Sequence, residues 1–155
     1  MAEQIIEVTR PTAAAPDAVF ALMLDAHGWP SWSPLDSASV ERHSPDGPGG
    51  VGEIRVVRTG RFTSRERVIA SDSPGHFAYE LLSSGLPVRG YEAHVRVEPS
   101  TTGATITWRS TFRPKVPGTG GLIRRGLGKF IAQLVEGLAA EAAAPQRRSA
   151  ERLRT

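Results

Sequence analysis

Few side chains in this 155-residue sequence combine the type and spacing that chemistry requires, and an arginine and a glutamate are the best placed. Arg55 and Glu66 lie on two neighbouring strand-like runs, GEIRVVRT and FTSRERVIASD, which the dipeptide GR separates. If that dipeptide forms a two-residue hairpin loop, Arg55 lies opposite Glu66 on the same face. The pair is then either a solvent-exposed ion pair contributing about 0 to 1 kcal/mol or a buried polar floor for a ligand.

Aromatic residues form the second group of candidates. The segment HGWPSWSP at 27–34 holds two of the three tryptophans, and three-residue spacing in a tight turn places Trp29 and Trp32 on the same side. They either fill a corner of the core or cover a ligand pocket. Tyr79 and Tyr91 flank the loop SSGLP, and each either presents its phenol to a cavity or packs with its hydroxyl at the rim.

Several reaction classes lack the residues that they need. The absence of cysteine excludes disulfides, thiolate chemistry and zinc-thiolate sites. The histidines at 27, 43, 76 and 94 have neither i, i+4 spacing nor an HExxH context, so we expect no metal site. No G-x-S-x-G motif is present, which argues against a serine hydrolase. The segment GPGGVG at 47–52 matches G-x-G-x-x-G but precedes a strand, so it is interpreted as a flexible turn.

The net charge of +3 is concentrated at the C-terminal end of the chain. The last ten residues, QRRSAERLRT, contain four arginines and one glutamate. Without these, the 19 basic and 16 acidic side chains become 15 of each, and a neutral body has no global field to attract nucleic acid. The basic segment is interpreted as a solvated end, with contact to an acidic partner or a membrane surface as the alternative.

Composition places the chain among globular domains. It is 39% hydrophobic and 23% charged, and its length suits one domain with one core. No apolar run approaches the ~20 residues that cross a bilayer, so no stable membrane insertion is expected. The first residues, MAEQIIEVTR, lack the pattern of a secretory signal, which makes a cytoplasmic location the default expectation.

Hydrophobic periodicity predicts the order of elements. A strand at 4–8 precedes a short helix from Pro16, and six strands separated by short turns follow between residues 37 and 112. Short turns join antiparallel neighbours, so we expect a meander with one buried face. In the last strand, alternation turns Trp108 and Phe112 inward.

A long amphipathic helix follows the last strand. Its apolar stripe includes Phe130 and Leu134, which would form the roof of a pocket, and the spacing predicts about 25 residues ending near Ala144. Three glycines within it permit close approach or bending. The chain is therefore divided into one domain at 1–144 and a basic tail at 145–155.

This order of elements resembles the helix-grip fold of the SRPBCC superfamily, which includes START-like lipid-transfer domains and the polyketide cyclase/dehydrase group. The resemblance covers residues 3 to 143. It is carried by PDAVFALMLDAHGWPSWSP, the hairpin GEIRVVRT and SRERVIASD, the pair HFAYELLSSGLPVRGY, and ATITWRSTF before the helix. It implies an α+β fold, in which a curved antiparallel sheet of about seven strands wraps around a long C-terminal helix, with two short helices after the first strand.

The resemblance also implies a cavity between the sheet and the helix, closed at one end by the short second helix. In related folds a glycine-rich loop placed like residues 47–52 borders the entrance. The residues expected to line this cavity are Trp29, Trp32, Arg55, Glu66, Tyr79, Tyr91, Trp108, Phe112, Phe130 and Leu134.

The function expected from these features is binding of a hydrophobic small molecule, lipid or aromatic and polyketide-like, as a carrier or sensor without a cofactor. One alternative is a polyketide cyclase/dehydrase-type enzyme, in which Arg55, Glu66, Tyr79 or Tyr91 transfers protons and stabilises an enolate. Another is an interaction protein with a filled cavity. The sequence leaves the ligand and the oligomeric state open.

Overall fold

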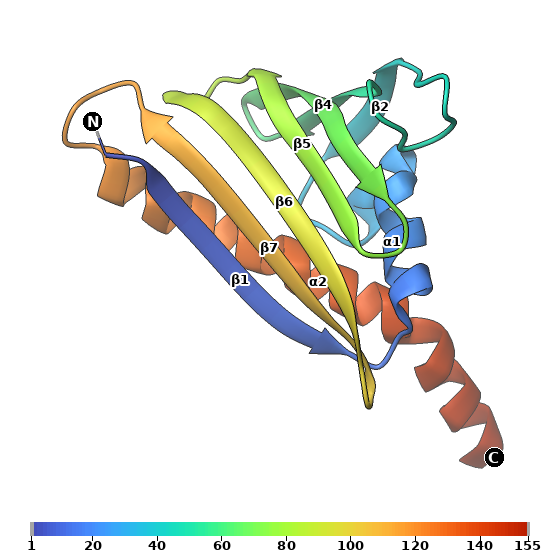
Figure 1. Ribbon diagram of the computed structural model, residues 1–155. Helices are drawn as coiled ribbons and strands as arrows, with labels where there is room; N and C mark the ends of the chain where they lie inside the picture. The colour runs from blue at the N-terminus through green and yellow to red at the C-terminus, as the bar shows by residue number, and fades with distance from the viewer. Residues whose placement is uncertain (1, 155) are drawn as a thin grey trace.

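Seven strands form one antiparallel sheet that curves around a long helix (Figure 1). The structure, a computed structural model, describes residues 2–154, apart from the side chains of residues 146–150. The strand order is β1-β7-β6-β5-β4-β3-β2, which confirms the predicted α+β helix-grip architecture. The elements are β1 (Gln4–Thr12), α1 (Pro16–Leu24), η1 (Ala26–Ser31), β2 (Ser37–Arg42), β3 (Ile54–Thr59), β4 (Phe62–Asp72), β5 (His76–Ser83), β6 (Val88–Ser100), β7 (Gly103–Pro114) and α2 (Gly120–Arg154).

The sheet is a meander from β2 to β7, and β1 completes it by pairing with β7. Its inner face is apolar because side chains alternate along each strand. On β7, Ile106, Trp108 and Phe112 are buried, whereas Arg109 between them is exposed. The inner face therefore presents a largely hydrophobic surface to α2, with Glu66 and Ser110 among its buried polar residues.

The two short helices cover the end of the sheet at which β1 stops (Figure 1). Pro16 occupies the first turn of α1, where a missing N–H costs nothing. Phe20 of this helix packs edge-on against Phe77 of β5, with ring centroids 6.2 Å apart. The segment η1 is a 3-10 helix that contains Pro30, and it brings the tryptophan pair under α2.

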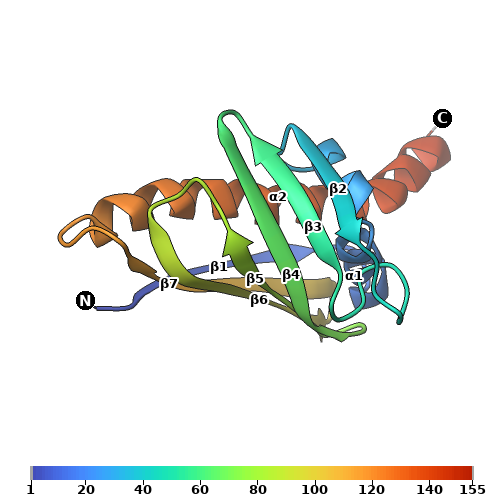
Figure 2. The same ribbon diagram turned by 90° about the horizontal axis from the view of Figure 1, so that it is seen from above.

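The helix α2 lies across the inner face of the sheet (Figure 2). Ile131, Leu134 and Leu138 on one side are buried. Gly137 permits the closest approach, because an added Cβ there would lie 1.7 Å from the carbonyl oxygen of Trp32. Among the described residues, no helix combines the length and hydropathy needed to cross a membrane.

The helix continues beyond the predicted end near Ala144 and reaches Arg154, with Pro145 inside it. A proline removes one helical hydrogen bond, which is why the sequence predicts an end there. The structure accommodates Pro145 within α2, and the C-terminal end of this helix projects past the sheet (Figure 1). Residues with good helix propensity then carry the helix on, so the predicted basic tail is a helical extension.

Candidate functional site

A cavity of about 380 Å³ lies between the inner face of the sheet and the first half of α2. Three elements converge on its opening, namely the β3–β4 hairpin, the β5–β6 loop and α2, and Figure 2 shows all three on one side of the molecule. The walls are mostly apolar. The lining residues are Trp29, Leu35, Val57, Thr59, Phe62, Ser64, Glu66, Tyr79, Leu81, Leu86, Pro87, Tyr91, Ile123, Gly126, Leu127, Phe130 and Leu134.

The cavity has a buried floor and an open mouth. Trp29, Tyr79 and Tyr91 at the floor are buried, whereas Phe62 and Gly126 at the mouth are exposed. A molecule can therefore enter from solvent and leave most of its surface in contact with protein.

Glu66 is the one ionisable carboxyl group in the lining. Its side chain comes from β4 and is 8% exposed, and its carboxylate has no hydrogen-bond partner among the described residues. Burial raises the pKa of Glu66 to about 7, and the nearby Arg55 guanidinium only partly opposes this. The group can therefore take up or release a proton near neutral pH.

Two phenols lie beside Glu66 on the floor of the cavity. The Tyr91 hydroxyl is 2.8 Å from the Ser110 Oγ, and the ring of Tyr79 lies 6.4 Å from that of Tyr91. Burial raises the pKa of Tyr91 to about 12 and the pKa of Tyr79 well above its usual value. Both hydroxyls remain protonated at neutral pH and can donate hydrogen bonds to a ligand.

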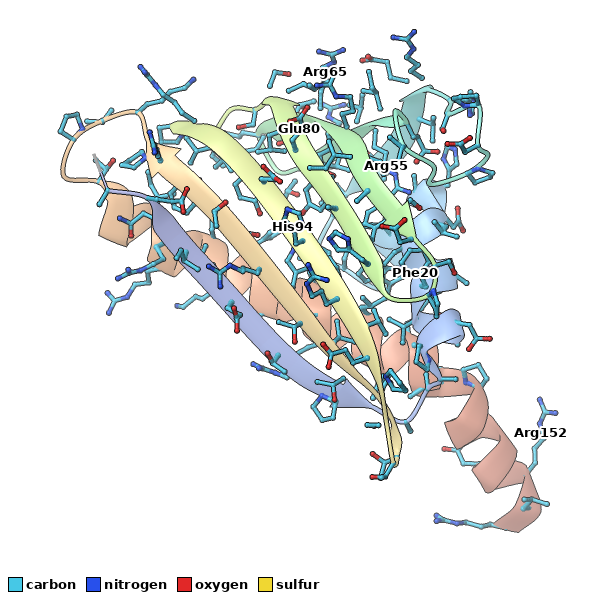
Figure 3. All side chains as sticks on the ribbon, viewed as in Figure 1. Phe20, Arg55, Arg65, Glu80, His94 and Arg152 are labelled. Carbon is cyan, nitrogen blue, oxygen red and sulfur yellow. The ribbon has the colours of Figure 1, made fainter. Side chains whose placement is uncertain are left out.

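Arg55 lies directly opposite Glu66 in the β3–β4 register, as the hairpin predicts. It is 2% exposed, so the alternative of a solvent-exposed ion pair is wrong. Its Nε donates to Oε2 of Glu53 at 2.6 Å, and another guanidinium nitrogen donates to the Leu24 carbonyl at 3.1 Å. Figure 3 shows Arg55 close to α1 and β4, and it is not among the residues that line the cavity.

Two aromatic rings contact the Arg55 guanidinium. Its central carbon lies 5.3 Å from the ring centroid of Trp29 and 5.2 Å from that of Phe77. Such contacts stabilise a desolvated cation. The arginine therefore supports the floor by fixing Trp29, and it does not itself face the cavity.

Six of the ten residues predicted for the cavity lie in its lining, and four do not. Trp108 and Phe112 face inward but are fully buried. Trp29 and Tyr79 pack edge-on against Trp108 at 5.9 and 6.3 Å, and Tyr91 stacks on Phe112 at 6.4 Å. Trp32 packs against Trp29 at 5.0 Å and borders a shallow groove on the other side of η1. Those in the lining are Trp29, Glu66, Tyr79, Tyr91, Phe130 and Leu134.

The sequence analysis missed part of the lining. Phe62 and Ser64 share the inward face of β4 with Glu66, so strand alternation was the signal that could have identified them. Leu86 and Pro87 come from the β5–β6 loop, whose position depends on tertiary packing.

The glycine-rich turn does not border the mouth, contrary to the expectation from related folds. The Gly49 N–H donates to Oε1 of Glu53 at 3.0 Å, and an added Cβ on Gly49 would meet Leu24 at 2.5 Å. The turn is therefore packed against the end of α1, and none of its residues contributes to the lining.

Solved structures with this fold support the architecture. A START superfamily protein from Mycobacterium smegmatis matches with a TM-score of 0.77 at 14% identity, over 89% of this chain and 96% of that one. The di-domain ARO/CYC StfQ from the steffimycin biosynthetic pathway matches with a TM-score of 0.77 at 18% identity, over 95% of this chain and 52% of its own. A point mutant of Thalictrum flavum norcoclaurine synthase, in complex with a transition state analogue, matches with a TM-score of 0.72 at 18% identity, over 94% of this chain and 97% of that one.

At these identities the structural likeness establishes the fold alone. No curated protein matches the sequence. The model of one family, described as polyketide cyclase / dehydrase and lipid transport, matches residues 3–143, which is nearly the whole chain. Together with the START-like neighbours, this match confirms the predicted SRPBCC-type helix grip. The chain belongs to the polyketide cyclase/dehydrase and lipid transport family.

Proposed function

We propose that this protein binds a hydrophobic small molecule, a lipid or an aromatic, polyketide-like compound, as a carrier or sensor. The observation that carries the proposal is the open cavity of about 380 Å³ with mostly apolar walls. Ligand sites span roughly 300 to 1,000 Å³, so this volume suits one compact ring system or one acyl chain. The open cavity supports the binding proposal over the alternative of an interaction protein with a filled cavity.

The lining favours one orientation of the ligand. The polar groups of Glu66, Tyr79 and Tyr91 lie at the buried floor, whereas Leu127 and Phe62 contact the part of a ligand nearer the mouth. A ligand with one polar end would place that end against the floor, where a hydrogen bond is strengthened by the low dielectric.

Native mass spectrometry tests the proposal, using two neighbouring residues of α2. Ile123 lines the cavity, and Leu122 beside it is 75% exposed and does not. The wild-type protein should retain one apolar molecule, or take up one equivalent from a panel of lipids and aromatic polyketides. Ile123→Trp should lower this uptake by filling the cavity, and Leu122→Trp should preserve it. Failure of the wild type to take up any member of the panel would contradict the proposal.

A second candidate function is cyclase-type catalysis in the same cavity, and Glu66 is the observation that favours it. A carboxylate with a pKa of about 7 can remove the proton between two carbonyl groups of a poly-β-keto chain. The Tyr79 and Tyr91 hydroxyls would stabilise the enolate oxygen. The enolate carbon then attacks another carbonyl, and the resulting alkoxide takes its proton back from Glu66.

Hydrogen–deuterium exchange of 2-tetralone in D₂O tests this second function, because exchange at the carbon next to the carbonyl requires only the proton-transfer step. The wild type should accelerate exchange, and Glu66→Gln should abolish the acceleration. Glu80→Gln is the control, since Glu80 binds Arg67 outside the cavity lining. Equal rates with and without protein would contradict catalysis and leave the binding proposal standing.

A further inference from the structure

The charge of this chain is unevenly distributed about the cavity mouth. Three segments surround the opening, at residues 58–65, 84–91 and 113–130, and they contain nine lysines and arginines without a single aspartate or glutamate. Glutamate and aspartate are confined to the remainder of the chain. These three segments are therefore strongly basic, although the body as a whole is neutral.

Most cations of these segments are also without carboxylate partners among the described residues. Only Arg65 forms an ion pair, with Glu41, and among the described residues the other eight form none. Two cations of the sheet away from the mouth are paired instead, Arg67 with Glu80 and Arg109 with Glu7. The eight unpaired cations, here called the basic rim, are Arg58, Arg61, Arg89, Arg113, Lys115, Arg124, Arg125 and Lys129.

Backbone contacts place part of the basic rim next to the segments that line the cavity. Arg89 and Arg113 are register partners on β6 and β7, and the Lys115 N–H donates to the carbonyl of Pro87, a lining residue, at 2.9 Å. Arg61 precedes the lining residue Phe62 at the tip of the β3–β4 hairpin. The carboxylate at this hairpin is Asp36, which accepts the Gly60 N–H at 2.7 Å.

Exposed apolar side chains stand among these cations. Leu122 is 75% exposed, Val116 53% and Phe62 46%, and all three belong to the same segments as the basic rim. Large apolar side chains exposed beside a functional opening mark an interaction surface. A lysine or arginine of the same segments lies within two residues of each, whereas charged residues are depleted at the centre of a stable protein interface.

We propose that the cavity mouth docks reversibly on an anionic lipid bilayer, with Leu122, Val116 and Phe62 in the headgroup layer and the basic rim against the lipid phosphates. Interfacial binding combines buried apolar side chains with attraction between cations and anionic lipids. A lipid surface carries one sign of charge, which matches a rim with one sign, whereas protein surfaces usually mix both signs.

The location of the mouth adds a second argument for a bilayer. The cavity opens within the docking surface, between Phe62 and Gly126. An apolar molecule could pass between bilayer and cavity without crossing water, which avoids the cost of hydrating its apolar surface. The inference goes beyond the proposed function and does not depend on which molecule the cavity holds.

Cosedimentation with vesicles tests the proposal. The probe is a vesicle of one part phosphatidylglycerol to two parts phosphatidylcholine, compared with phosphatidylcholine alone. The wild type should sediment with the anionic vesicles only, and added salt should release it. Arg124→Glu with Arg125→Glu should weaken binding about tenfold or more, and Leu122→Ser should weaken it less.

The matched control is Arg42→Glu with Arg96→Glu, which changes the net charge equally at exposed positions on β2 and β6. This control should bind as the wild type does, and circular dichroism should show all variants folded. The proposal is overturned if the wild type ignores anionic vesicles, or if both charge reversals weaken binding equally. Retention on polyglutamate without binding to vesicles would assign the basic rim to an acidic protein and overturn it as well.

Discussion

Arg55 and Glu66 are direct cross-strand partners, yet Arg55 turns its guanidinium to Glu53 and leaves the Glu66 carboxyl group to the cavity. The consequence is a buried acid without a hydrogen bond, facing a mostly apolar space. Its pKa of about 7 follows from burial that one nearby cation only partly offsets. The same residue therefore links the stability of the domain to the chemistry of its cavity.

The raised pKa of Glu66 predicts a pH-dependent contribution to the free energy of unfolding. Between the model-compound value of 4.5 and the folded value of about 7, the unfolded chain releases this proton while the folded protein retains it. The titration of Glu66 therefore leaves the free energy of unfolding unchanged below pH 4.5. It lowers that free energy by about 3 kcal/mol as the pH rises from 4.5 through 7. Glu66→Gln should escape this loss, so urea unfolding of the two proteins should diverge from pH 4 to pH 8 by about that amount.

The comparison with Glu66→Gln cancels the titration of all other groups. Glu80→Gln, which alters a half-exposed ion pair with Arg67, serves as a second reference and should follow the wild-type curve closely. If the difference in the free energy of unfolding between the wild type and Glu66→Gln stays constant across this pH range, Glu66 has an ordinary pKa.

Glu53 and Arg55 form a buried ion pair, with side chains only 2% and 3% exposed. Glu53→Ala should lower the free energy of unfolding by about 3 to 5 kcal/mol, because it leaves the Arg55 charge buried without its partner. It also removes the acceptor of the Gly49 N–H. In the exposed pair of Arg109 and Glu7, Glu7→Ala should cost about 0 to 1 kcal/mol. Chemical denaturation measures both, and equal losses would refute this assignment.

Trp108 and Phe130 should respond differently to truncation. Trp108 is fully buried beneath Trp29 and Tyr79, so Trp108→Ala should cost about 3 to 5 kcal/mol of stability. Phe130 faces the open cavity and is only partly buried, so Phe130→Ala should cost about half as much or less while altering ligand uptake. Thermal unfolding and native mass spectrometry together separate the two, and a larger loss of stability in Phe130→Ala would contradict the described cavity.

Two glycines of α2 should give opposite results on replacement by alanine. At Gly137 a Cβ would lie 1.7 Å from the Trp32 carbonyl oxygen, so Gly137→Ala should force the helix away from η1 and cost about 1 to 3 kcal/mol. Gly128 has no atom within 4 Å of such a Cβ, and Gly128→Ala should stabilise the helix by about 0.5 to 1 kcal/mol. Urea unfolding of both variants checks the sign, and stabilisation by Gly137→Ala would exclude the close packing.

Strand alternation and turn chemistry account for what the sequence predicted well. The hairpin loop after Thr59 set the Arg55–Glu66 register, and the period of the last strand turned Trp108 inward. These rules assign a side chain to a face of the sheet. They do not say how deep it lies on that face, and so Trp108 was expected in a lining from which other aromatic rings exclude it.

The remaining features depend on tertiary geometry. Whether Arg55 binds Glu53 or Glu66 depends on the direction of its side chain, since both carboxylates share its face. The basic rim arises because the topology gathers three segments distant in sequence around one opening. The net charge alone indicates a neutral body, and the fold is needed to show that these basic side chains gather near one opening.

The most direct test of an open cavity that takes an apolar molecule is a methyl NMR titration with the neutral probe N-phenyl-1-naphthylamine. The account predicts saturable shifts at one equivalent for the methyl groups of Leu81, Leu86 and Leu127, which line the cavity. The methyl groups of Val19 and Val95, buried in the core outside it, should remain unmoved. Shifts confined to methyl groups outside the lining, or none at all, would contradict the central claim.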